Sequence, residues 1–185
     1  MRTLLAAVLA SGLIVAAHGL AAAQRGDDPQ KDIQAMYNRA SAATVSAKTY
    51  ADTEAIHKWL DTPDCTFTAF MQAARTWEQM RPEIEAGLAT PLASLDSVIR
   101  KIEVTGTTTA IATTVVEARA RIIDEAGQYG AKGAAHDIVS RATVRDVWVK
   151  APDGWRRKSH EKLTPTGVAS VDGKLPTATP RKSQG

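Results

Sequence analysis

The residue of this sequence best suited to acid–base chemistry is Asp146, a carboxylate within a stretch of alternating residue types. In this stretch, residues 135–150, the residues at every second position are mostly apolar, which is typical of a β-strand with one buried face. Asp146 belongs to that row and is therefore expected to point inward, where lost hydration raises a carboxyl pKa unless a partner holds the charge. Such a group acts as a general acid or as a donor to an oxyanion. Alternatively, it is a structural carboxylate bonded to Tyr37 or an arginine. The row comprises His136, Ile138, Ser140, Ala142, Val144, Asp146 and Trp148.

Aromatic side chains complete the candidate site. Tryptophans are usually core residues, and this reading stays open for all four, but aromatic walls also suit apolar small molecules. His136 lies near the start of its strand, where it either faces the pocket mouth or is solvated. We predict a ligand-binding pocket lined by Trp59, Trp77, Val144, Trp148 and His136.

The sequence predicts neither a metal nor a cofactor site. Its single cysteine, Cys65, excludes an intramolecular disulfide and a cysteine-based zinc site. No two of His57, His136 and His160 have the spacing of paired metal ligands. The basic run 156–158 is expected to be a solvated strand edge, with binding of an anionic partner as the alternative.

Composition and charge narrow the class of protein. The chain has 185 residues, of which 44% are hydrophobic and 23% charged, as in a soluble globular domain. This composition excludes a wholly disordered, fibrous or multi-span membrane chain. The formal net charge of +3 is too small and too scattered to predict a nucleic-acid partner.

The first 23 residues have the pattern of a secretory signal peptide. A positive start at Arg2 precedes a short apolar run, and small residues end at Ala23 before the polar Gln24. We expect cleavage after Ala23 and a secreted or periplasmic product without a membrane span. An uncleaved membrane anchor is the alternative. Residues 24–31 are expected to be flexible and 165–185 to form a disordered basic tail, because neither buries enough apolar surface.

Between these ends, residues 32–164 form the predicted domain, beginning with helices. Apolar residues at helical spacing predict helices over 32–47 and 52–60. Residues 62–64 are expected to break the chain before a short strand at 65–70. A capping box of Thr76 and Gln79 predicts a third helix, which either kinks or begins at Pro82.

The second half of the domain has β-sheet texture. Strands are predicted at 98–104, 108–123, 135–150 and 155–163, with a hairpin loop at 124–133. Helices followed by a long antiparallel meander indicate an α+β fold.

Two short motifs and their order make the sequence resemble the nuclear transport factor 2-like superfamily, in its SnoaL-like bacterial branch. The stretches 145–150 and 153–156 resemble the last hairpin of that superfamily, and the helix containing Tyr37 matches its opening helix. The resemblance covers about residues 32–164. It implies a curved antiparallel sheet wrapped around N-terminal helices into a cone with an internal pocket.

The resemblance also implies roles for two residues. By motif order Asp146 matches the oxyanion-hole aspartate of ketosteroid isomerases, and Tyr37 matches their oxyanion-hole tyrosine. The sequence departs from those isomerases at 66–70, where their general-base carboxylate stands and this chain has no acid. Isomerase activity is therefore not expected, because proton abstraction needs a base within reach.

Two classes of function follow. The first is a non-catalytic binding or interaction domain for a small apolar or amphipathic molecule, and the second is a lyase, isomerase or cyclase that uses Asp146 and Tyr37. Members of the superfamily commonly dimerise through the outer face of the sheet, so the resemblance predicts a homodimer. Neither the ligand nor the reaction is readable from the sequence.

Overall fold

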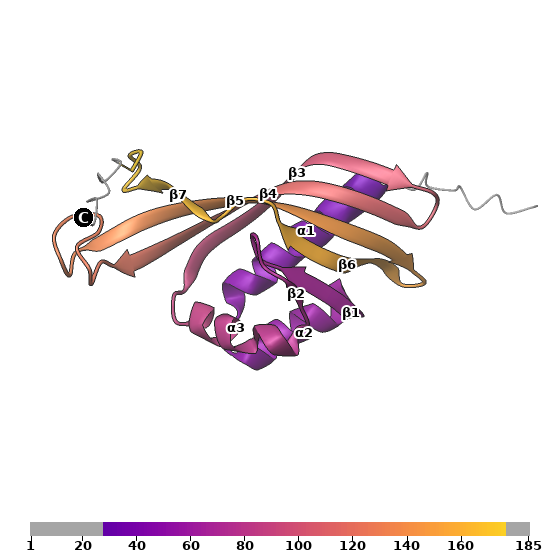
Figure 1. The fold of residues 1–185 in the computed structure, drawn as a ribbon, viewed down its shortest axis with the longest axis horizontal. Helices are drawn as coiled ribbons and strands as arrows, with labels where there is room; N and C mark the ends of the chain where they lie inside the picture. The colour runs from indigo at the N-terminus through magenta and orange to yellow at the C-terminus, as the bar shows by residue number, and fades with distance from the viewer. Residues whose placement is uncertain (1–27, 177–185) are drawn as a thin grey trace, which may run out of the picture.

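The computed structural model describes residues 28–176, in which three helices pack against one face of a curved sheet (Figure 1). The predicted signal peptide lies outside the described residues. No helix within 28–176 has the length and apolar character needed to cross a membrane.

Local capping determines where the helices begin. Helix α1 spans Pro29–Ser46, three residues earlier than predicted, because the Asp28 carboxylate accepts the Lys31 amide at 3.1 Å and Pro29 suits a first turn. Residues 29–31, expected to be flexible, are therefore helical. Helix α2 spans Tyr50–Leu60 behind a capping box of Thr49 and Asp52. The predicted box of Thr76 and Gln79 forms at the start of a short 3₁₀ turn, η1 (Glu78–Met80), and Pro82 lies in the first turn of α3 (Arg81–Leu88).

Seven strands form one sheet in the order β2-β1-β6-β5-β4-β3, and β7 pairs separately with β5. All described pairs are antiparallel except β1 with β6, which is parallel. The sheet is therefore mixed rather than purely antiparallel. The strands are β1 (Asp61–Thr68), β2 (Ala74–Arg75), β3 (Leu92–Thr105), β4 (Thr109–Ile123), β5 (Ala135–Ala151), β6 (Gly154–Lys162) and β7 (Gly167–Val171).

Two segments differ from the sequence-based prediction. The expected break at 62–64 lies inside β1, where a shift in register between Asp61 and Thr66 accommodates Pro63. The tail predicted to be disordered from 165 onward begins with β7, which pairs with 138–141 of β5. The apolar run of β7 is short, and the prolines and glycines on either side of it favoured a prediction of disorder. Residues 177–185 of this predicted tail lie outside the described residues.

The long strand β5 organises the sheet. It pairs with β4 along its length, while β6 and β7 follow one another along its other edge. Figure 1 shows β4 and β5 extending well beyond the helices, with β7 near their far end. The helices cover only the other half of the sheet, where the core lies.

The core forms where α1 crosses the sheet. Ala110 and Ala112 on β4 are fully buried, and their small side chains leave room for Ile33 and Tyr37 of α1. At the edge of the sheet the side-chain amide of Gln34 donates to the Ser97 carbonyl at 2.7 Å and accepts the Ile99 amide at 3.1 Å. These contacts fix α1 against β3.

The inside–outside alternation predicted for β5 is confirmed. Val144, Asp146 and Trp148 are buried, whereas Arg141 and Arg145 on the other row are exposed. Self-association through this outer face stays a prediction.

Candidate functional site

A cavity of about 480 Å³ lies between the three helices and the inner face of the sheet. This volume lies within the range of small-molecule sites, which is roughly 300–1,000 Å³. Most of its wall is apolar, with scattered serine and threonine hydroxyls, and its charged and imidazole side chains gather around one buried arginine. The apolar wall includes Ala40, Val45, Ile56, Leu60, Trp77, Ile84, Leu88, Leu92, Leu95, Val116 and Val144.

The central polar contact is a bidentate ion pair between Arg157 of β6 and Asp61, the first residue of β1. Arg157 donates from Nε to Oδ1 of Asp61 at 2.7 Å and from Nη2 to Oδ2 at 3.2 Å. Both side chains are largely buried, with exposed fractions of 13% and 1%. Burial alone would raise the pKa of Asp61, but the charge of Arg157 and the hydrogen bond from His57 hold that pKa below its ordinary value.

His57 of α2 extends this pair toward the cavity wall. Its Nδ1 lies 2.8 Å from Oδ2 of Asp61, one helical turn further along the chain. Its ring stacks on Trp77, with centroids 4.4 Å apart and planes 4° from parallel. The stacking and the hydrogen bond together fix the orientation of the imidazole.

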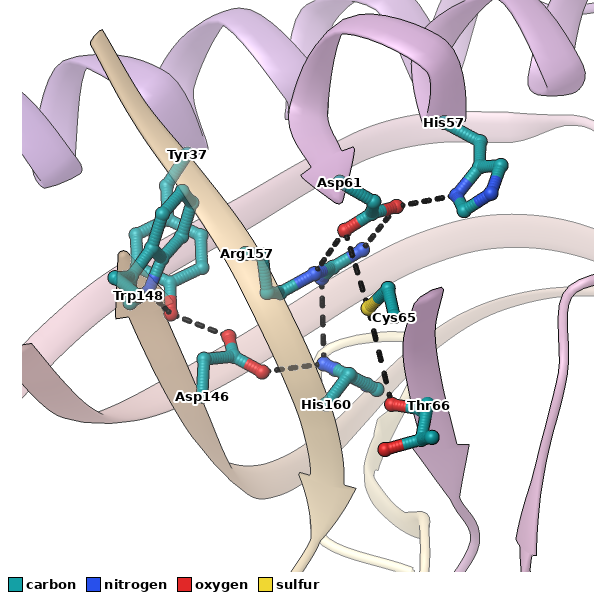
Figure 2. Close-up of polar contacts among 9 residues, drawn as sticks. All are labelled: Tyr37, His57, Asp61, Cys65, Thr66, Asp146, Trp148, Arg157 and His160. Carbon is teal, nitrogen blue, oxygen red and sulfur yellow. Dashed lines mark hydrogen bonds and ion pairs between the residues drawn. The ribbon is translucent and has the colours of Figure 1, made fainter. Parts of the chain in front are cut away.

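Asp146 of β5 lies on the other side of Arg157 and is fully buried. Its Oδ2 accepts a short hydrogen bond from the Tyr37 hydroxyl, and its Oδ1 lies 2.7 Å from Nδ1 of His160. The Trp148 indole in turn donates to the Tyr37 oxygen at 3.3 Å. Figure 2 shows the resulting chain of contacts, which runs from Trp148 through Arg157 to His57.

These contacts keep Asp146 ionised. Burial would raise its pKa, but the positive charge that His160 carries when protonated, the charge of Arg157 and the hydrogen bonds that Asp146 accepts hold the pKa below the ordinary value. Burial and the Asp146 carboxylate raise the pKa of the Tyr37 hydroxyl well above its usual range. Tyr37 therefore keeps its proton and donates a hydrogen bond to Asp146.

A β-bulge in β6 brings Arg157 and His160 to the same face of the sheet. Trp148 pairs with Arg157 and Asp146 pairs with His160, so one extra residue of β6, Lys158, is accommodated between the two pairs. Without the bulge, residues three apart in a strand would point to opposite faces. The sequence-based view of 156–158 as a uniformly solvated edge is therefore wrong for Arg157.

The structure brings together some of the predicted site residues and separates others. Tyr37, Asp146, Trp77 and Val144 line the cavity. Trp148 is fully buried behind Tyr37, with the two rings 5.2 Å apart, and does not line it. Trp59 packs against the core with the Arg39 guanidinium over its ring, and it does not line the cavity either.

His136 lies away from this cavity, beyond the part of β5 that the helices cover. Its Nδ1 lies 2.7 Å from the Asp172 carboxylate, just after β7, and its ring packs against Gly130 and Tyr129 of the hairpin loop. The pairing with β7, which was not predicted, accounts for this position.

Sequence reasoning missed four residues of the site: Asp61, His57, Arg157 and His160. They come from α2, β1 and β6, and parallel pairing of β1 with β6 brings Asp61 opposite Arg157. The clearest signal in the sequence was the spacing of His57 and Asp61, which places both on one side of a helix end.

The geometry leaves His57 and His160 as the groups able to exchange protons with a ligand. Because an ionised carboxylate only accepts hydrogen bonds, Nδ1 of each histidine donates to its aspartate. No described residue bonds to Nε2 of either ring, and both rings line the cavity. A neutral imidazole held in this way presents Nε2 as a base. No group of three or more His, Cys, Asp or Glu side chains within 28–176 is arranged to hold a metal ion.

Helices packed on a curved sheet, with a pocket between them, define a class of cone-shaped α+β domains. No family model and no curated protein matches the sequence, whereas many solved structures match the fold. This chain has the nuclear transport factor 2-like fold, as the resemblance in its sequence predicted.

Three solved structures illustrate the match. A conserved protein from Planctomyces limnophilus superposes with a TM-score of 0.55 at 12% identity, covering 76% of this chain and 97% of that one. An NTF2-like protein of unknown function from Prochlorococcus gives 0.51 at 13%, covering 76% and 96%. An NTF2-like superfamily protein from Salmonella enterica gives 0.51 at 19%, covering 75% and 92%. At these identities the likeness concerns the fold alone.

Proposed function

We propose that this domain binds a small, largely apolar molecule in the cavity between its helices and its sheet. The observation that supports this proposal is the distribution of residue types around the cavity, in which an apolar wall surrounds one polar cluster. The wall would bury the body of a ligand, and the Nε2 atoms of His57 and His160 would orient its polar group.

Binding can be tested with the uncharged fluorophore N-phenyl-1-naphthylamine, whose emission rises in apolar surroundings. Val116→Trp would fill the cavity, because Val116 lines it, and should weaken binding at least tenfold. Val115→Trp is the matched control on the other face of the same strand and should change affinity less than twofold. Equal effects of the two variants, or no binding by the wild type, would contradict the proposal.

A second candidate function is favoured by the contact between Asp146 and His160. A carboxylate that fixes the tautomer of an imidazole is the usual arrangement of a general base, so the same cavity could serve a lyase, isomerase or cyclase. In this second candidate function, His160 exchanges the proton with the substrate, and Asp146 and Tyr37 position the His160 ring. The missing acid at 66–70 then matters less, because the base comes from β6 instead of β1.

Dehydration of a β-hydroxy ketone tests this second candidate. His160 would remove the proton next to the carbonyl while hydroxide leaves the neighbouring carbon as water, with the proton returned by the site. For 4-hydroxy-4-phenylbutan-2-one the product is a conjugated enone with strong ultraviolet absorbance. Wild-type turnover that falls at least a hundredfold in His160→Gln would support catalysis, and turnover that is absent or unchanged would contradict it.

We also propose that the chain is exported, and the support for this is the pattern of residues 1–23 alone. Intact-mass measurement of protein from the native host would show a chain that begins at Gln24. A species that still begins at Met1 would contradict export with cleavage.

A further inference from the structure

The charged groups at the cavity do not balance. Of the described residues that line it, the ones that are charged at neutral pH, histidines aside, are two aspartates, Asp61 and Asp146, and one arginine, Arg157. With neutral imidazoles the cluster therefore carries one excess negative charge. The helices add no compensating group, because no lysine is among the described residues that line the cavity.

The single cation among the described residues that line the cavity is already occupied. Arg157 uses two of its hydrogen-bonding nitrogens on Asp61, and its remaining Nη1 lies 3.3 Å from Nδ1 of His160. A ligand carboxylate would have to displace Asp61 to pair with the Nε and Nη2 edge of Arg157, and the remaining Nη1 side of the guanidinium adjoins the His160 ring. Displacement would leave the buried Asp61 carboxylate without its cationic partner, which is strongly unfavourable.

Apart from the serine and threonine hydroxyls of the wall, the groups of the charged cluster that best reach a ligand are the two imidazoles, which accept a hydrogen bond when neutral. Asp61 and Asp146 are almost completely covered, with side-chain exposed fractions of 1% and 0%, so they act on a ligand mainly through their field. His57 and His160 are partly exposed, at 12% and 26%, and each offers the lone pair of Nε2 when neutral. Both ring centroids lie about 6 Å from the ring of Phe67, so the two imidazoles belong to one region of the cavity.

We infer that the cavity selects uncharged or cationic ligands that carry a hydroxyl or an amine, and that it rejects carboxylates and other anions. The hydroxyl or ammonium group donates to an imidazole Nε2, and the excess negative charge favours a cation over an anion of equal size. This inference deepens the proposed function, since it assumes that the cavity binds a small apolar molecule.

Three probes with the same eight-carbon chain test the inference: 1-octanol, octylamine and octanoate. Calorimetry is done at pH 8, where an ordinary imidazole is neutral, octylamine is a cation and octanoate an anion. Comparing the two ions cancels most of the cost of dehydrating a charge. The expected result is that octanol and octylamine each bind at least tenfold more tightly than octanoate.

Charge-neutralising variants show whether the cluster causes this selectivity. Asp61→Asn removes the excess charge and should reduce the preference for octylamine over octanoate at least fivefold. Asp146→Asn does the same if Asp61→Asn fails to fold, as thermal unfolding would reveal. Asp64→Asn is the matched control, because Asp64 is exposed and pairs with Lys158 outside the cavity, and it should leave the preference unchanged.

The outcomes separate the inference from the function beneath it. Octanoate binding as tightly as octylamine in the wild type would overturn the inference and leave the binding function intact. A preference that survives in the folded Asn variants would overturn the assignment to this cluster. If none of the three probes binds, the proposed binding function fails together with the inference.

Discussion

The guanidinium of Arg157 and the imidazole of His160 lie on the same face of β6 although they are three residues apart. The bulge at Lys158 produces this relationship, and it places one positive charge between two buried carboxylates. The cluster of Asp61, Arg157, Asp146 and the two histidines depends on that single extra residue. Its contribution to the free energy of unfolding and its dependence on pH can both be measured.

Replacing Arg157 by Met should destabilise the fold by about 3–5 kcal/mol, because it leaves Asp61 as a buried charge without its partner. Arg145→Met is the matched control on the neighbouring strand. Arg145 pairs with Glu161 at an exposed position, and its loss should cost less than about 1 kcal/mol. Urea unfolding at pH 7 measures both values. Equal losses of unfolding free energy in the two variants would contradict a buried ion pair between Arg157 and Asp61.

Acid should weaken the fold through Asp61 and Asp146. The folded protein lowers the pKa of both carboxyl groups, so their stabilising contribution is present above the ordinary aspartate pKa of about 3.9 and is lost as the pH falls below it. The difference in unfolding free energy between wild type and Asp61→Asn should therefore shrink between pH 7 and pH 3. A difference that stays constant over this range would show that folding does not lower the pKa of Asp61.

The Tyr37 hydroxyl should remain protonated in the folded protein at high pH. Burial and Asp146 raise its pKa far above 10, so the tyrosinate absorbance that develops on titration to about pH 11 should be the same in wild type and in Tyr37→Phe. Larger absorbance in the wild type would show that Tyr37 ionises.

Tyr37→Phe should also destabilise the fold, by about 1–3 kcal/mol, since it leaves one oxygen of Asp146 without its donor. The loss should be largest below pH 10, because the contribution of a group whose pKa is raised disappears as the pH rises. Urea unfolding at pH 7 measures this cost.

Cys65 should be chemically silent in the folded protein. Its thiol is buried beside Asp61, and burial together with that negative charge raises its pKa to about 12. A disulfide reagent such as 5,5′-dithiobis(2-nitrobenzoate) at pH 8 should react with less than a tenth of the thiol within minutes. The same sample in guanidinium chloride should react completely, whereas rapid reaction of the folded protein would contradict this burial.

Local sequence patterns predicted the elements and part of the site. Strand alternation placed Asp146 inside, and the resemblance brought Tyr37 near it, because both depend on short-range periodicity or motif order. The partnership of Asp61 with Arg157 depends instead on the parallel pairing of β1 and β6, two segments 96 residues apart. No local pattern specifies such a pairing.

The positions of His136 and His160 likewise depend on structure that no local sequence pattern specifies. The sequence singled out His136, yet β7 and the hairpin loop hold it away from the cavity. His160 was considered as a possible metal ligand, and a one-residue bulge in β6 brings it to the same face as Arg157. Bulges of this kind are not visible in the sequence of a single strand.

The amide of Gln34 has a consequence for the behaviour of the protein in crowded solution. Strand β3 is an edge of the sheet, and edges with free backbone groups invite further strands from other molecules. By occupying the Ser97 carbonyl and the Ile99 amide, Gln34 imitates a neighbouring strand at the middle of that edge. A foreign strand would have to expel this side chain before it could pair along the middle of β3, so one glutamine on the first helix obstructs edge-to-edge pairing at this edge of the sheet.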